Sequence, residues 1–300
     1  MRNAVRFRKD SQTEFVKKFS GLCSSKSSWE VWADFIAMSA IAIANAFDQQ
    51  GLTHDAREQE YMGKIQRYTK AEQQIFPQLF ALTVEALEHD PDQDFFGALF
   101  MGLNLGSHWK GQFFTPYNVC RMLAEIQLHS LEDHIKEKGW VGIHDPCCGA
   151  GALMIAARNV MVREKLGPAS ALYVAQDIDR TAALMCYIQL SLMGCAGYVV
   201  VADSLQYPLA GPGGSPLLIS PSPEQEVWLM PALYDETWCG RVQLERMRLA
   251  LKSLGVFGSA NKSQVQDMEQ AHPENEQAQT GLVNNPVPLN EGPGGQLTLF

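Results

Sequence analysis

Residues 141–157 read VGIHDPCCGAGALMIAA. A short apolar run ends in Asp145, Gly149 and Gly151 follow, and an apolar helical pattern begins behind them. Glycines allow a tight turn and a close approach of a ligand, and the next helix adds backbone N–H donors. Met154 replaces the third glycine of the dinucleotide fingerprint, and a carboxylate at the strand end would repel a pyrophosphate. The loop therefore predicts a site for a nucleoside that carries an amino acid, whose ammonium and ribose hydroxyls a carboxylate can bind.

Two later apolar runs also close on an aspartate. Residues 171–177 (ALYVAQD) end in Asp177, and residues 198–203 (YVVVAD) end in Asp203. Helical patterns separate these runs, which is typical of a parallel α/β sheet whose strands end at one common edge. The helical patterns span 151–165 and 179–193. Each aspartate alone could be a helix cap or a loop residue, but three in series with a glycine loop favour a ligand site.

The chain divides by composition into three parts. Residues 1–105 are predicted to form a small all-α domain, residues 106–258 an α/β domain and residues 259–300 a disordered tail rich in Gln, Asn, Glu, Pro and Gly. The helical patterns of the first part span 29–47, 55–69, 70–89 (with Pro77 in its first turn or at a kink) and 94–103. A fourth strand is predicted over 216–220 (PLLIS) and a later helix over 240–254.

Charge and cysteine content exclude some classes of protein. The 300 residues carry a net charge of −9, and the segment from Ser259 onward, with one lysine and five acidic residues, holds four of those charges. A nucleic-acid site would need a local basic patch, for which the basic residues within the first 18 are the candidate, although they also suit a solvated helix face. Seven scattered cysteines without a CxxC pair predict neither a disulfide framework nor a metal site. No membrane span or signal peptide is predicted, so we expect a cytoplasmic protein.

A family resemblance rests on several of these stretches together. DFFGALFMGLN at 94–104, KGQFFTPYNVCRML at 110–123 and the loop DPCCGAG are similar to segments of the N-6 adenine DNA methylase family. That family includes the modification subunits of type I restriction–modification systems. The resemblance implies a Rossmann-like methyltransferase domain, S-adenosyl-L-methionine as cofactor and DNA as substrate. It assigns the cofactor pocket to Gly111, Gln112, Phe113, Phe114, Thr115, Pro116, Asp145, Pro146, Gly149 and Gly151, with Asp177 at the ribose and Asp203 at the adenine ring.

The catalytic motif departs from that family. The family carries Asn-Pro-Pro-aromatic after its fourth strand, where the Asn side chain and a prolyl carbonyl accept hydrogen bonds from the target amine of a flipped base. Here the run PLLIS leads into Ser220-Pro221-Ser222-Pro223. Ser220 and Pro221 are therefore the candidate catalytic residues, with a hydroxyl acceptor in place of an amide. The aromatic residues that follow, Trp228, Tyr234 and Trp238, suit core or surface packing better than base stacking.

Three functions stay open at this point. The first is S-adenosylmethionine-dependent DNA adenine-N6 methylation, and the second is a cofactor-binding but catalytically weak or inactive DNA-associated accessory or anti-restriction protein. The third, a small-molecule or RNA methyltransferase, is disfavoured by the GQFFTP segment. The chain shows no obvious target-recognition domain, which suggests a specificity subunit as partner. Residues Gln296–Phe300 (QLTLF) resemble a peptide that binds the bacterial sliding clamp.

Overall fold

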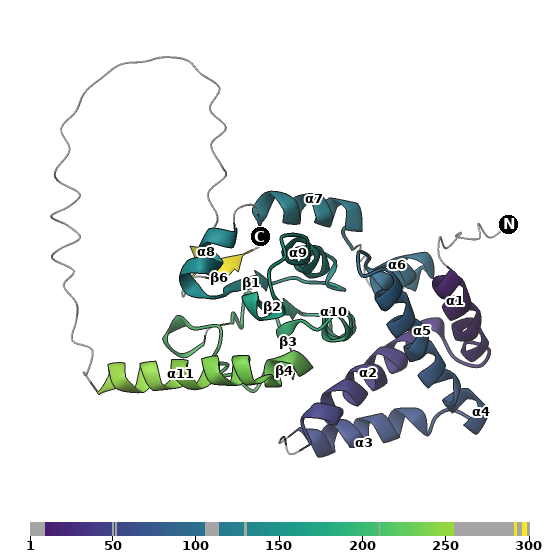
Figure 1. The fold of residues 1–300 in the computed structure, drawn as a ribbon. Coiled ribbons are helices and arrows are strands. Elements are labelled where there is room, and N and C mark those ends of the chain that lie inside the picture. Colours follow the sequence, from purple (N-terminus) through teal and green to yellow (C-terminus); the bar gives the residue numbers. More distant parts are fainter. Residues whose placement is uncertain are drawn as a thin grey trace, which may run out of the picture.

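The computed structural model describes residues 10–49, 51, 53–105, 114–128, 131–209, 211–254, 291–292 and 296–298. Figure 1 shows a helical N-terminal part beside a layered α/β part. The predicted fold class, an α/β sheet behind a helical segment, is confirmed.

The described residues of the N-terminal part form six helices. They are α1 (Asp10–Leu22), α2 (Ser28–Phe47), α3 (His54–Ile65), α4 (Lys70–Gln73), α5 (Ile75–His89) and α6 (Phe95–Gly102). Ser27 caps α2, because its side chain accepts the Glu30 N–H at 3.1 Å, and the apolar helix behind it is mostly buried. The predicted helix over 70–89 is divided at Gln74, and Pro77 lies in the first turn of α5, where a missing N–H costs nothing.

The sheet has the order β4-β3-β2-β1-β6-β5. Its strands are β1 (Val141–Asp145), β2 (Ala171–Asp177), β3 (Ala196–Val201), β4 (Glu226–Leu229), β5 (Glu291–Gly292) and β6 (Gln296–Thr298). Strands β1, β2 and β3 are parallel, and β4 runs antiparallel to β3. The first two strands have the predicted bounds, and β3 begins two residues earlier than predicted.

Helices cover both faces of the three central strands. On one face lie α9 (Ala152–Arg163) and α10 (Arg180–Leu192), which share a core with Ile143, Tyr173 and Val199. On the other face α11 (Glu236–Ser253) buries Trp238 against a second cluster that includes Leu172 and Val174. The helices α7 (Tyr117–Gln127) and α8 (Leu131–Lys138) precede the sheet (Figure 1). Helices α1, α7 and α8 were not predicted.

The predicted strand over 216–220 is wrong. These residues form a turn and an extended loop after a short 3-10 helix at Pro212–Gly214, and the fourth strand in chain order is Glu226–Leu229. This strand pairs with the outer edge of β3 and runs in the opposite direction. A glycine- and proline-rich segment cannot supply the regular ladder of N–H donors that a strand needs, whereas EVWL can.

The edge beside β1 is filled from the far end of the sequence. β6 pairs in parallel with β1, with Gly142 opposite Gln296 and Thr298 opposite His144, and β5 pairs antiparallel with β6. Residues 291–292 and 296–298 are thus the part of the predicted tail that pairs in the sheet. The remainder of the tail lies outside the described residues.

The boundary at residue 105 stays a prediction. A continuous hydrophobic cluster runs from Phe15 in α1 to Trp228 in β4, so the helices before the boundary and the sheet share one core. Helix α2 is long and apolar enough to cross a membrane by length and composition, contrary to the expectation that no segment would be. Two thirds of the segment that meets this test is buried in the protein.

A glycine in β3 provides a test of the sheet. Gly197 has φ +152°, and a Cβ there would lie 1.8 Å from the carbonyl oxygen of Tyr173. Because that neighbour is strand backbone and cannot give way, Gly197→Ala should lower the free energy of unfolding by about 3 kcal/mol or more, as measured by urea denaturation. Gly63→Ala, in open space on α3, is the matched control and should raise stability by about 0.5–1 kcal/mol. Equal effects of the two substitutions would contradict the described β2–β3 contact.

Candidate cofactor site

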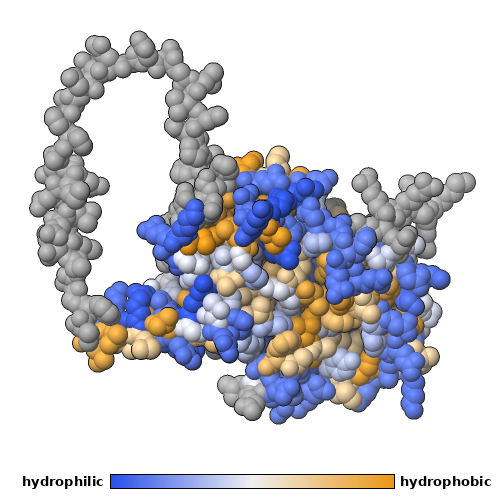
Figure 2. Space-filling view, viewed as in Figure 1, coloured by the Kyte–Doolittle hydropathy of each residue, from blue (hydrophilic) through white to orange (hydrophobic). Residues whose placement is uncertain are grey.

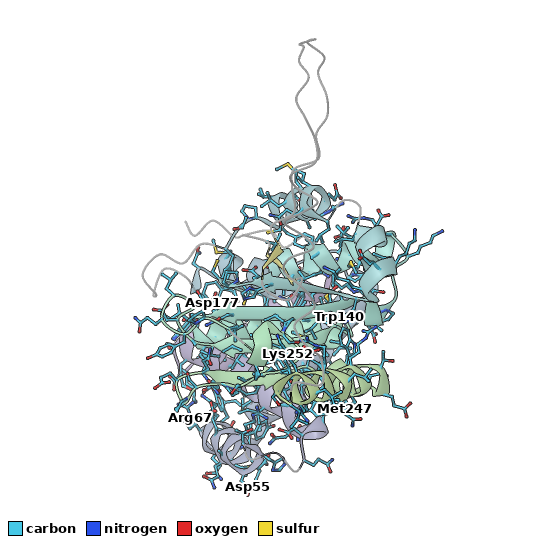
Figure 3. All side chains as sticks on the ribbon, turned by 90° about the vertical axis from the view of Figure 1, so that its left-hand side faces the viewer. Asp55, Arg67, Trp140, Asp177, Met247 and Lys252 are labelled. Atoms are coloured by element: carbon cyan, nitrogen blue, oxygen red, sulfur yellow. The ribbon has the colours of Figure 1, made fainter. Side chains whose placement is uncertain are left out.

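The carboxyl ends of the parallel strands carry the predicted aspartates. Asp145 ends β1, Asp177 ends β2 and Asp203 follows β3 by two residues. Figure 3 shows Asp177 at one end of the strand layer and Trp140, which precedes β1, at the opposite end. The fold therefore gathers the three side chains at one edge of the sheet, the edge where open α/β sheets bind ligands.

The glycine loop is held against this edge by backbone hydrogen bonds. The Gly149 N–H donates to Oδ2 of Asp177 at 2.8 Å, and the Cys147 N–H donates to Oδ1 of Asp145 at 3.1 Å. Gly149 (φ +54°) and Gly151 (φ +93°) both adopt left-handed backbone, and a Cβ on Gly151 would lie 2.8 Å from Sγ of Cys186. The loop therefore needs both glycines, one for its turn and one for its packing on α10.

Part of the predicted GQFFTP segment lies over the loop. A Cβ on Gly149 would approach the Phe114 ring to 3.0 Å, and the Phe114 ring centroid lies 5.1 Å from that of Phe100. Thr115 and Pro116 are exposed, and Pro116 immediately precedes α7. Gly111, Gln112 and Phe113 lie outside the described residues. The structure thus brings Phe114 to the glycine loop from a segment 35 positions away.

Asp203 has a local role in the loop after β3. Its Oδ1 accepts the N–H groups of Leu205 at 2.9 Å and Gln206 at 3.3 Å, which is a common way for an aspartate to hold a turn. Asp177 is also engaged, since its Oδ1 accepts the Asp179 N–H at 2.8 Å. A carboxylate oxygen has two lone pairs, so these bonds leave room for a ribose hydroxyl or an amino group.

Burial sets the electrostatics of the site. Asp145 is 2% exposed, and burial, together with the nearby Asp177 charge, raises its pKa to about 6. Burial likewise raises the pKa of Asp177. Burying two carboxylates within one site is costly unless a cation joins them. The arrangement therefore favours a ligand with a positive charge, such as the ammonium group of an amino acid.

The sequence interpretation missed the residue that anchors the loop. The Gln189 side chain, buried in α10, donates through Nε2 to the Ala150 carbonyl and to Oδ1 of Asp94, both at 2.9 Å. Its Oε1 accepts the N–H groups of Phe95 at 2.9 Å and Phe96 at 3.2 Å. The available signal was a glutamine within the apolar helical run CYIQLSL, where an amide must find buried partners.

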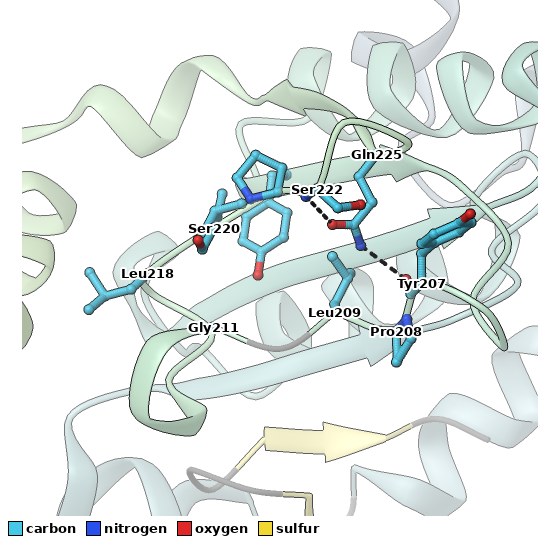
Figure 4. Close-up of a pocket in the computed structure, with 11 residues that line it drawn as sticks. Tyr207, Pro208, Leu209, Gly211, Leu218, Ser220, Ser222 and Gln225 are labelled. Carbon is cyan, nitrogen blue, oxygen red and sulfur yellow. Dashed lines mark hydrogen bonds between the residues drawn. The ribbon is translucent and has the colours of Figure 1, made fainter.

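Ser220 and Pro221 lie in the segment between β3 and β4. They line a cavity of about 220 Å³ on the face of the sheet that α11 covers, together with Tyr198, Tyr207 and Gln225. Gln225 closes one wall, because its Nε2 donates to the Tyr207 carbonyl and its Oε1 accepts the Ser222 N–H (Figure 4). Neither Asp145 nor Asp177 is among the residues that line this cavity.

The sequence profile described as N-6 DNA Methylase matches residues 103–225. The family resemblance is confirmed over this stretch. This methylase family uses S-adenosylmethionine as its cofactor. The glycine loop and the buried carboxylates described above suit a molecule of this kind. The search of curated proteins gives no match.

Two solved structures are similar at low identity. A protein from Listeria monocytogenes described as a class I S-adenosylmethionine-dependent methyltransferase has 15% identity and a TM-score of 0.37, over 67% of this chain and 56% of its own. The methyltransferase subunit of a type I restriction-modification system from Streptococcus thermophilus has 12% identity and a TM-score of 0.36, over 66% of this chain and 59% of its own. The chain thus spans less than two thirds of either protein.

The raised pKa of Asp145 leads to a stability prediction. The pKa of Asp145 is about 6 in the folded protein, above the ordinary 3.8. Between these pH values the carboxyl is protonated in the folded protein and ionised in the unfolded chain, so raising the pH through this range destabilises the fold. Above pH 6 the buried carboxylate is ionised and the destabilisation has its full value. Asp145→Asn removes that cost and keeps an acceptor for Cys147. We expect a gain on the order of 1–3 kcal/mol in urea denaturation at pH 7.5, vanishing near pH 4. A loss of stability at pH 7.5 would show that the carboxylate is compensated in the free protein.

Proposed function

We propose that the chain is the S-adenosylmethionine-binding component of a DNA adenine-N6 methyltransferase. One observation carries the proposal: the carboxylates of Asp145 and Asp177 flank a two-glycine loop at the carboxyl edge of a parallel sheet. The match to the methylase family over the same stretch supports it. DNA as substrate, a specificity subunit as partner and a cytoplasmic location belong to the same proposal.

The loop residues suit the parts of the cofactor. Asp145 would pair with the ammonium group and Asp177 would accept a ribose hydroxyl, while Phe114 would cover the loop and exclude water. Gly149, Gly151 and Pro146 would let the backbone approach the amino-acid end, and Asp203 would reach the adenine side. When bound, the cofactor supplies an activated methyl group. The protein's own part is to orient that group and to keep the site dry.

The position of Ser220 favours a second candidate function. The predicted catalytic residues Ser220 and Pro221 line a cavity. The proposed cofactor ligands Asp145 and Asp177 do not line it. A hydrogen-bond acceptor contributes to transfer only where the target amine meets the methyl group. The second candidate is therefore a cofactor-binding accessory or anti-restriction protein with weak or no transfer activity. In the first candidate, Ser220 and Pro221 remain the predicted acceptors.

Cofactor binding and methyl transfer can be measured separately. Titration calorimetry with S-adenosylmethionine should give one site, and Asp145→Ala should weaken binding at least about tenfold, because a buried charge partner is lost. Glu88→Ala, which removes an exposed carboxylate on α5, should bind as the wild type does. Binding unaffected by Asp145→Ala would remove the basis of the proposal.

Methyl transfer is followed with methyl-tritiated cofactor and unmethylated genomic DNA. Label in N6-methyladenine that is lost in both Asp145→Ala and Ser220→Ala would support the enzyme with Ser220 as acceptor. Label that survives Ser220→Ala would move the acceptor role elsewhere. Cofactor binding without label in any base would favour the accessory function.

The segment Gln296–Phe300 adds a proposed partner. We expect it to bind the bacterial sliding clamp through its aliphatic and aromatic residues, as a short peptide docked in an apolar groove. In the described fold the backbone of Gln296–Thr298 pairs with β1, so clamp binding and strand pairing would compete for the same residues.

Replacing Leu299 and Phe300 by Ala should abolish co-elution of the protein with purified clamp in size-exclusion chromatography, because the apolar anchors are lost. The matched control replaces Pro286 and Pro288 in the same tail by Ala and should co-elute as the wild type does. A wild-type protein that does not co-elute with the clamp would end this proposal.

A further inference from the structure

A second, larger cavity lies where the helical part meets the outer strand of the sheet. It has a volume of about 500 Å³ and is bounded by Asp48 and Thr53 at the facing ends of α2 and α3, by β4, by the 217–221 segment and by α11. Figure 2 shows apolar residues gathered on the face where α11 approaches helices α2 and α3. The cavity shares Ile219 and Pro221 with the wall of the smaller cavity but does not include the cofactor carboxylates.

The walls are largely aliphatic and built from regular structure. Alternation along β4 turns Val227 and Leu229 to this cavity, while Trp228 between them is fully buried in the core on the other side. Leu233 and Val242 line the cavity as well. A concave, mostly apolar surface supported by a strand and a helix is preformed for an apolar molecule.

One arginine is fixed within the wall. Arg57 donates through Nη2 to the Val227 carbonyl at 3.2 Å, and its Nη1 lies 3.5 Å from Oδ2 of Asp48. Its guanidinium lies 4.6 Å from the centroid of the Trp228 ring. Only 11% of the Arg57 side chain is exposed. Asp48 compensates its charge, so Arg57 serves as a placed hydrogen-bond donor that joins α3 to β4.

A second arginine leaves the cavity with an excess positive charge. Arg246 of α11 lines the cavity and is exposed, and no acidic side chain of the described residues pairs with it. Two arginines and one aspartate are the charged residues of the described lining. One net positive charge beside an aliphatic hollow complements a single negative charge on an apolar body.

We infer that this cavity binds an organic monoanion with an aromatic or aliphatic body, such as a carboxylate or sulfonate, with its charge at Arg246 and its body against Val227, Leu229 and Val242. The cofactor proposed above does not fit this description, because its sulfonium and ammonium groups would meet Arg57 and Arg246. The inference does not depend on methyl transfer or on the proposed cofactor site.

The probe for the test is 1-anilinonaphthalene-8-sulfonate, an aromatic monoanion whose fluorescence rises in apolar surroundings. The full chain should bind one equivalent in a fluorescence titration at low salt. Arg246→Gln should weaken binding up to about fivefold, the range of an exposed ion pair, and added salt should remove that difference. Arg248→Gln is the matched control, since Arg248 lies on the same helix, pairs with Glu245 and does not line this cavity.

Filling the cavity tests the site of the apolar body. Val242→Trp should weaken binding more than tenfold, whereas Leu244→Trp, on an exposed position of the same helix, should leave it unchanged. Circular dichroism checks that each variant is folded. If Val242→Trp does not fold, the test rests on Arg246→Gln alone. The inference would be overturned if the probe did not bind, or if it bound at several equal sites. It would also be overturned if both Arg246→Gln and Val242→Trp were folded and bound the probe as the wild type does.

Discussion

The buried amide of Gln189 is the interaction on which the arrangement of the glycine loop depends. It joins the Ala150 carbonyl of the loop to Asp94 and to the first N–H groups of α6. Burial raises the pKa of Asp94, and the Gly97 N–H is its second donor. An unpaired group in such a network is costly, so loop, α6 and α10 adopt one common geometry. The helical part is thus a support for the loop as well as a neighbour of the sheet.

A second link joins the helical part to the outer strand. Arg180, next to the Asp179 cap of α10, forms ion pairs with Glu60 of α3 at 2.9 Å and with Glu226 of β4 at 2.8 Å. The Trp228 ring lies near Arg180, 5.7 Å away, and near Arg57. Partial exposure keeps each pair weak, but together they fix how α3 meets the sheet edge. Both cavities near Ile219 therefore depend on contacts made by residues far apart in the sequence.

The sequence predicted the elements in which pattern and environment agree. The runs that form β1 and β2 are apolar and contain β-branched residues, so the bounds of both strands could be predicted. The glycines of the loop that ends in Gly151 indicated a tight turn after β1, and so the edge of the sheet at which the aspartates lie. The strand predicted for PLLIS was wrong because apolar residues alone do not make a strand when no neighbouring strand pairs with them. Instead EVWL, which begins with a charged residue, pairs with the edge of β3. The hydrogen bonds by which Asp203 holds a turn could not be predicted, because they depend on how the loop after β3 folds back on itself. Gln189 could not be assigned a role because its partners come from positions 94–96 and 150.

The pairing of β6 with β1 has a consequence for the order of folding. Gly142 and Gln296 are 154 positions apart, whereas the partners Val141 and Ala171 in β1 and β2 are 30 apart. Loop closure of that length costs conformational entropy that three paired residues recover only in part. We therefore expect β6 to join the sheet after β1, β2 and β3 have paired, and to leave it before they separate. On this expectation, opening of the β1–β6 pair would expose the edge of β1 while its pairing with β2 persists.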